Sequence, residues 1–118
     1  MPDRTAQARV VSFAPIDYAL VKRDLKDAPA EPRTILLQAL RWRLTKSKSR
    51  ARQEVLTGYI HHDIFDLASG EQISNSMVIG AVLSHETEMV REYGARLLNV
   101  MTSDAAGRAY ILLCGGLP

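Results

Sequence analysis

The sequence contains a single cysteine, Cys114, and only 6% of its 118 residues are aromatic. A lone cysteine excludes an internal disulfide, and it has no companion with which to build a structural zinc site. Nothing around Cys114 would lower the pKa of its thiol, and it follows Leu112 and Leu113, so we expect a small core residue rather than a nucleophile. The fold must therefore be stabilised without either kind of cross-link.

Long hydrophobic runs are also missing. No window approaches the unbroken apolar length of a membrane span, and the first residues, MPDRTAQARVV, lack the apolar core of a secretory signal. The default compartment is then the cytoplasm. A hydrophobic content of 47% and a charged content of 24% are typical of a globular protein and exclude disorder throughout. We expect a flexible leader over residues 1–12 and one helical domain over 13–118.

Motifs that carry catalysis or bind cofactors are absent as well. The chain has no Gly-rich phosphate loop, no paired-carboxylate motif and no Ser/His/Asp signature. His61, His62 and Asp63 come nearest to a metal site, but neighbours in a helix point to different sides and no second Cys or His cluster completes the ligand set. We predict no enzyme activity, no cofactor, no metal and no small-molecule substrate.

The strongest pattern that is present runs from Glu31 to Tyr59. Pro32 suits the start of a helix, and the polar run 45–49 suits its end. Between them, apolar residues recur at helical spacing over more than half of the helix circumference. They are Ile35, Leu36, Leu37, Ala39, Leu40, Trp42 and Leu44. A second helix follows from Ser49, with Val55, Leu56, Tyr59 and Ile60 on one side. The stretch predicts a helical hairpin with a charged bend, in which Trp42 is largely buried.

The segments on either side of this hairpin also have helical signals. A helix is predicted from Pro15, with Ile16, Ala19, Leu20 and Leu25 along the side toward the core. After the hairpin we expect a short extra turn that Asp63 caps and Gly70 closes.

The run MVIGAVL, Met77 to Leu83, fits either a buried strand or a short buried helix. We favour a helix capped by Ser74 or Asn75, because no other segment resembles a strand that could pair with it. In such a helix Gly80 needs a packing reason, since glycine costs about 1 kcal/mol relative to alanine in a helix interior. We expect Gly80 or Gly94 to let neighbouring helices approach closely.

The clearest amphipathic helix follows. Ser84 is its predicted N-cap, with Glu86 and Glu88 in its first turn. Its apolar face recurs in steps of three and one: Val90, Tyr93, Gly94, Leu97, Leu98 and Met101. Asp104 is predicted to cap a last helix that includes Tyr110 and ends at the Gly115-Gly116 pair.

These signals together predict an all-α fold of about six helices. A short helix, an apolar helix and a longer amphipathic helix in that order form the unit of helical solenoids. The sequence therefore predicts a helical hairpin followed by the start of an armadillo- or HEAT-like α-solenoid, with armadillo-like helices from about residue 50 onward.

Two motifs resemble one known family. They are LLQALRWRL, Leu36 to Leu44, before a basic turn, and VREYGARLL with AGRAYIL in the tail, Val90 to Leu98 and Ala106 to Leu112. Both are similar to the family of LisH-domain, armadillo-repeat-containing protein nine, and the string QALRWRL is the most specific part. The resemblance covers roughly Phe13 to the end, but the family's LisH motif and its later repeats are not visible.

The resemblance implies a non-enzymatic scaffold of the centriole and ciliary basal body. It implies a role in assembling or stabilising cilia and in cilium-dependent signalling, with a location in the cytoplasm and cytoskeleton. The partners would be other ciliary or centriolar proteins. Dimerisation through LisH and a groove formed by several repeats do not carry over to these residues.

The only candidate functional site that the sequence offers is a cluster of positively charged residues. Residues 1–52 hold twelve basic and five acidic side chains, and residues 53–118 hold three and eight, so the halves carry +7 and −5. The densest cations are Arg41, Arg43, Lys46, Lys48, Arg50 and Arg52, which we call the basic bend. An acidic protein surface, for example a tubulin-like one, is one partner it would suit. Nucleic acid or an anionic lipid surface is the alternative, and nucleic acid is less favoured because Trp42 belongs to the apolar pattern. A solvated bend without a partner is the third reading.

Overall fold

The computed structural model describes residues 16–67 and 77–114, which form six α-helices and a π-helical turn and contain no strand. They are α2 (Tyr18–Asp27), α3 (Ala30–Thr45), α4 (Ser49–His61), α5 (Met77–Leu83), α6 (Glu88–Thr102), α7 (Ala105–Ala109) and the π-helical η2 (Tyr110–Cys114). The predicted all-α class is confirmed. The order of hairpin, short apolar helix and long amphipathic helix is that of the start of an armadillo- or HEAT-like solenoid.

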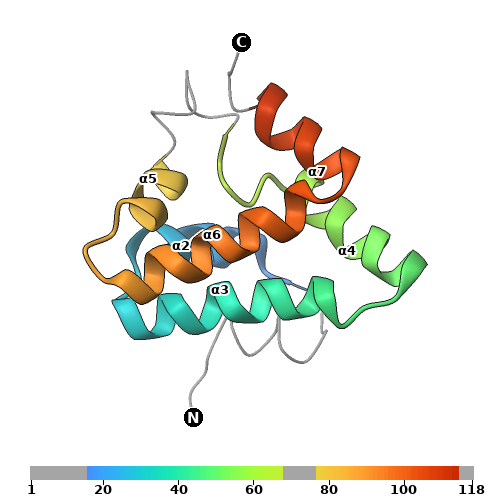
Figure 1. The fold of residues 1–118 in the computed structure, drawn as a ribbon. Helices are drawn as coiled ribbons and strands as arrows, with labels where there is room; N and C mark the ends of the chain where they lie inside the picture. The colour runs from blue at the N-terminus through green and yellow to red at the C-terminus, as the bar shows by residue number, and fades with distance from the viewer. Residues whose placement is uncertain (1–15, 68–76, 115–118) are drawn as a thin grey trace.

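Helices α3 and α6 lie side by side through the centre of the molecule and share its most extensive contact (Figure 1). Helix α2 packs against α3 and α5 and lies behind α6 in this view. Helix α4 turns away from the end of α3, and α7 contacts both α4 and α6. The core therefore sits around α3, with α2, α4 and α6 on different sides of it.

Helix α3 is buried over most of its circumference, as the wide apolar arc predicts. Its core residues are Leu36, Leu37, Ala39, Leu40 and Leu44. Its exposed residues, Glu31, Ile35, Trp42 and Thr45, fall within about a quarter of the turn at 100° per residue. The expected burial of Trp42 is wrong, because Trp42 lies on this outer arc and its side chain is 40% exposed.

The junction of α2 and α3 is held by a buried arginine that the sequence did not single out. Ala28 is extended before Pro29, which ends α2 and leaves the Ala28 carbonyl open. Nε of Arg33 donates to that oxygen at 2.9 Å, and Nη1 donates to the carbonyl of Ala81 in α5 at 3.0 Å. The guanidinium, only 6% exposed, thus ties α2, α3 and α5 together.

The starts of two helices differ from the prediction. Asp17 rather than Pro15 precedes α2, and its carboxylate accepts the Leu20 N–H at 3.1 Å. Leu25 lies in the core and Ile16 and Leu20 pack against it, as expected, whereas Ala19 is exposed and Val21 is buried in its place, contrary to expectation. Ser84 does not cap α6, since its N–H still bonds to the Gly80 carbonyl as the end of α5.

Other predicted helix boundaries are confirmed. Helix α4 begins at Ser49 and buries Leu56 and Tyr59. Tyr59 donates its hydroxyl hydrogen to the Leu40 carbonyl of α3 at 2.9 Å, and burial raises the pKa of this hydroxyl. Asp104 caps α7 by accepting the Ala106 N–H at 2.9 Å. Helix α6 turns Val90, Gly94, Leu97 and Met101 inward, which agrees with the predicted face.

Met77–Leu83 is a helix, as favoured, but it is buried on one face only. Val78 and Val82 are in the core, whereas Gly80 is exposed and has no neighbour that an added Cβ would meet within 4 Å. Gly94 provides the close approach instead, because a Cβ there would lie 2.1 Å from Cγ1 of Val82. The predicted caps Ser74 and Asn75 and the terminators Gly70 and Gly115-Gly116 lie outside the described residues.

Asp63 does not cap a helix but closes the loop after α4. It has a left-handed φ of 53°, which aspartate tolerates better than most residues. Its Oδ1 accepts the Leu67 N–H at 2.9 Å and the Tyr110 hydroxyl at 2.5 Å. The Tyr110 oxygen in turn accepts the Phe65 N–H at 3.0 Å, so η2 fixes a loop more than forty residues earlier.

Gly80 of α5 and Gly94 of α6 predict opposite responses to alanine. Gly94→Ala should destabilise the fold by about 1–3 kcal/mol, because Cγ1 of the stiff Val82 side chain must move. Gly80→Ala should stabilise it by up to about 1 kcal/mol, because the space is open and alanine favours the helix. Thermal unfolding followed by circular dichroism compares them. Equal midpoints for the two variants would contradict this packing of α5 on α6.

Trp42 and Tyr59 form a second matched pair, since both are large aromatic residues of the hairpin. Tyr59→Ala should cost about 3–5 kcal/mol, because Tyr59 is fully buried. Trp42→Ala should cost only about 1 kcal/mol, because much of the indole ring already contacts water. Urea unfolding followed by circular dichroism gives both values. A loss of 3 kcal/mol or more for Trp42→Ala would instead agree with a buried indole.

Candidate docking surface

The basic bend occupies the end of α3, the connection to α4 and the first turn of α4. The structure does not hold its six cations as one surface. Lys46, Lys48 and Arg50 are exposed, whereas Arg41, Arg43 and Arg52 are only partly accessible. The predicted docking residues therefore separate into an outer group and an inner group.

The outer group comprises Lys46, Lys48 and Arg50, and Trp42 lies beside it. Lys46 follows the last turn of α3, where its N–H donates to the Trp42 carbonyl at 2.8 Å. Its Nζ lies 5.4 Å from the centroid of the Trp42 ring, within cation–π range. Since α3 ends here, its carbonyl dipoles also favour Lys46, whereas Lys48 and Arg50 lie at the start of α4. The outer group can therefore offer positive charge to a partner without first breaking a buried contact.

Arg43 belongs to the inner group and faces α2. It lines a hollow of about 380 Å³ together with Tyr18, Ser47 and Glu54. Burial raises the pKa of the Tyr18 and Tyr59 hydroxyls, and the positive charge of Arg43 opposes part of that rise. Arg43 thus contributes to the electrostatics of the packed interior as well as to the bend.

Arg52 joins the hairpin to the rest of the molecule. Its guanidinium donates to the Leu44 carbonyl at 3.5 Å and to Oγ of Ser103 at 3.4 Å. Its neighbour Gln53 donates to Oδ2 of Asp104 at 2.8 Å, and this bond is the main cause of a lowered pKa for Asp104. Arg52 therefore holds α4 on the junction of α6 and α7 and is poorly placed for docking.

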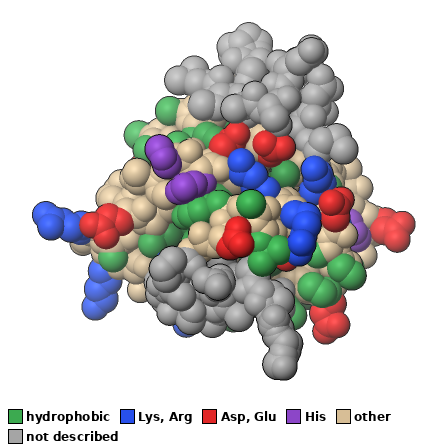
Figure 2. Space-filling view, turned by 180° about the vertical axis from the view of Figure 1, so that it is seen from behind, with side chains coloured by type: hydrophobic (Ala, Val, Ile, Leu, Met, Phe, Trp, Pro, Cys, Tyr) green, Lys and Arg blue, Asp and Glu red, His purple; other side chains and the backbone are tan. Residues whose placement is uncertain are grey.

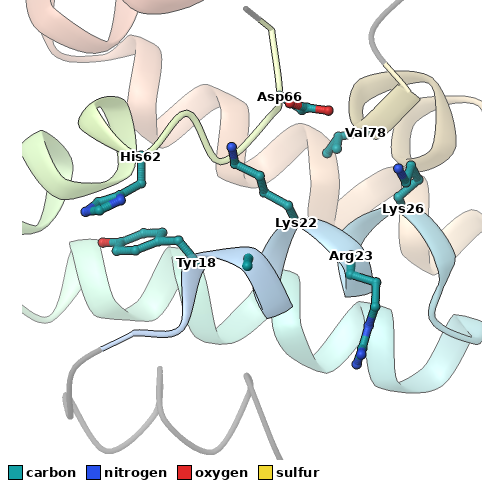
Figure 3. A pocket seen from close by; sticks show the side chains of 8 residues that line it. Tyr18, Lys22, Arg23, Lys26, His62, Asp66 and Val78 are labelled. Carbon is teal, nitrogen blue, oxygen red and sulfur yellow. The ribbon is translucent and has the colours of Figure 1, made fainter. Parts of the chain in front are cut away.

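The histidine pair makes no metal site. The rings of His61 and His62 are nearly perpendicular, with centroids 5.0 Å apart, and His62 stacks on Tyr18 at 4.1 Å (Figure 3). Within residues 16–67 and 77–114, no three His, Cys, Asp or Glu side chains are grouped to hold a metal ion. The hollow beside this stack, about 420 Å³, is lined by side chains of both charges, including Lys22, Lys26 and Asp66.

On the part of the rear face that described residues form, Figure 2 shows lysine and arginine side chains interspersed with acidic ones, and histidine side chains on the left beside apolar ones. Among the described helices, none is both long enough and apolar enough to cross a membrane.

Sequence reasoning missed one apolar surface at the other end of α3 from the bend. Ile35 of α3 and Met89 of α6 are exposed by 41% and 50% and line a common hollow between the two helices. The sequence did contain a signal for this surface, because the apolar arc of α3 is wider than the neighbouring helices can cover. The spacing of the apolar residues alone could not show which part of this arc remains exposed to solvent.

Comparison with known proteins gives relatives of one kind. The chain is 40% identical over 106 residues to the LisH domain-containing protein ARMC9 of Xenopus tropicalis, covering 89% of this chain and 13% of that protein. It is 41% identical to the Bos taurus protein and 40% identical to the Homo sapiens protein of the same name, each over 97 residues. These two alignments cover 81% of this chain and 14% and 11% of the relatives.

No family model matches the chain, and no solved structure matches it. The chain spans only about an eighth of the length of these relatives, so it corresponds to one segment of them. The similarity nevertheless extends over more than four-fifths of the chain. On this similarity, the chain belongs to the family of the LisH domain-containing protein ARMC9.

Proposed function

We propose that this segment is a non-enzymatic protein-interaction piece of a centriole or ciliary basal-body scaffold. The role would lie in assembling or stabilising cilia and in signalling that depends on them. The proposal is supported by membership of the family, since the family resemblance implies a protein of the cytoskeleton at the ciliary base. An all-helical segment with solenoid-like helix order suits such a role, because stacked helices present broad surfaces to partners.

The observation that supports docking of a partner at the basic bend is the exposure of Lys46, Lys48 and Arg50 at one end of the α3–α4 hairpin. Three cations on five consecutive positions create a positive potential with no acid between them. The partner that suits them is an acidic protein surface, such as that of another ciliary or centriolar protein.

Nucleic acid is the second candidate, and the side-chain arrangement favours it less. Lys46 lies over the Trp42 ring, where a base would have to stack. Arg52 and Arg43 are engaged within the fold, so fewer cations than the sequence suggested can contact a phosphate backbone.

Reversing the three exposed cations tests the proposal. The full-length gene product carrying Lys46→Glu, Lys48→Glu and Arg50→Glu should lose most of its accumulation at the ciliary base, because the positive surface becomes negative. Fluorescence of the tagged protein at basal bodies of ciliated cells measures this. Circular dichroism of the variant chain should stay unchanged, since these side chains are exposed.

A triple reversal of Lys22, Arg23 and Lys26 on α2 is the matched control, because it changes net charge equally at another face. This control should leave basal-body accumulation intact. Diffuse or nuclear signal for the unmodified protein would contradict the ciliary proposal. Nuclear retention that only the bend reversal abolishes would favour nucleic acid.

A further inference from the structure

The outer arc of α3 forms a continuous strip that leads into the basic bend. Glu31, Ile35, Gln38, Trp42 and Lys46 recur at steps of four, three, four and four, so they lie in one line along the helix. Ile35 and Trp42 are exposed by 41% and 40%. We call these five residues the α3 strip.

A groove widens the strip toward α6. The space between the first turns of α3 and α6 has a volume of about 440 Å³, and Ile35, Gln38 and Met89 are among the residues that line it. Met89 is half exposed although it is large and apolar. Ile35, Met89 and Trp42 are the exposed apolar side chains of this surface, and no described element covers them.

Charge is ordered along the same line. Glu31, in the first turn of α3, lies at one end of the strip, and Lys46 lies at the other, close in sequence to Lys48 and Arg50. Ile35 and Lys46 are eleven residues apart, which is about 16 Å along a helix. The surface is therefore negative at one end, apolar in the middle and positive at the other end.

We propose that the α3 strip and its groove bind an amphipathic helix of an acidic partner, with the acidic end of that helix over Lys46, Lys48 and Arg50. Apolar side chains of the partner helix fill the groove between Ile35 and Met89 and cover Trp42. This inference rests on the proposed docking function and adds to it the form of the partner and a second, apolar contact.

A helix fits this surface better than an extended peptide. Ile35 and Trp42 are seven residues apart on one helical face, and a partner helix presents apolar residues at the same repeat. An extended peptide usually gains affinity by adding to a sheet edge, and residues 16–67 and 77–114 contain no strand.

Trp42 is the only tryptophan of the chain, so its fluorescence reports directly on this surface. The probe is a synthetic helical peptide without tryptophan, with three glutamates in its first turn, leucines at helical spacing in the middle and lysines in its last turn. Added to the full chain, it should shift Trp42 emission to the blue saturably and protect Trp42 from quenching by acrylamide. Two control peptides replace the glutamates by lysine or the leucines by serine, and each should bind at least tenfold more weakly.

Variants of the chain separate the apolar contact from the charged one. Ile35→Glu and Met89→Glu should each weaken binding of the probe at least tenfold, because they place a charge in the groove. Leu112→Glu is the matched control, since Leu112 is also apolar and is 48% exposed but belongs to η2. This control should bind as the unmodified chain does. Circular dichroism confirms that each variant is folded.

Three results would overturn the inference. No saturable shift with the acidic peptide would exclude the helix site, and binding lost on reversal of Lys46, Lys48 and Arg50 but kept in Ile35→Glu and Met89→Glu would leave only the charged docking function. A Trp42 spectrum that changes with protein concentration alone, with a dimer in light scattering, would assign the surface to a second copy of the chain. The basal-body experiment does not depend on these results, so the two proposals fail separately.

Discussion

The fold depends on covering α3. A helix with apolar residues around most of its circumference is unstable in water, so it must be enclosed by neighbours with apolar faces of their own. Helices α2, α4 and α6 supply those faces from segments before and after α3 in the sequence. Their placement follows from this one requirement, and it leaves open the narrow arc that contains Ile35 and Trp42.

Polar groups fix how the neighbours sit on α3. Leucine and valine pack acceptably in many registers, whereas a buried hydrogen bond has one geometry and is costly to leave unmade. The Tyr59 hydroxyl on the Leu40 carbonyl sets α4 against α3, and Arg33 sets α5 against the α2–α3 junction. Tyr110 does the same for the loop after α4. A small number of such bonds is enough to hold a helical assembly in a single register.

Periodicity predicted the helices and most of their inner faces, because burial of an apolar stripe is a local property of sequence. It succeeded for α4 and α6, and it failed where a neighbour decides the outcome. The last helix was predicted from its Asp104 cap, and it divides into α7 and the π-helical η2. Trp42 matched the apolar pattern, but no helix within residues 16–67 and 77–114 covers its side of α3. Ser84 resembled an N-cap, yet its N–H belongs to the turn that ends α5. The cations of the bend also look equivalent in sequence, and only the fold shows that Arg52 bonds to the Leu44 carbonyl of α3 and to Ser103 at the end of α6.

The joint that Arg52 and Gln53 make with Ser103 and Asp104 has a mechanical consequence. A hairpin that contacted the rest of the molecule only through its own turn would bend easily under a force applied at its tip. Here the first turn of α4 is fastened to the corner between α6 and α7, close to the exposed cations. Force applied at Lys48 would then pass into the longest helices of the molecule. The hairpin should therefore be stiffer than one attached through its turn alone.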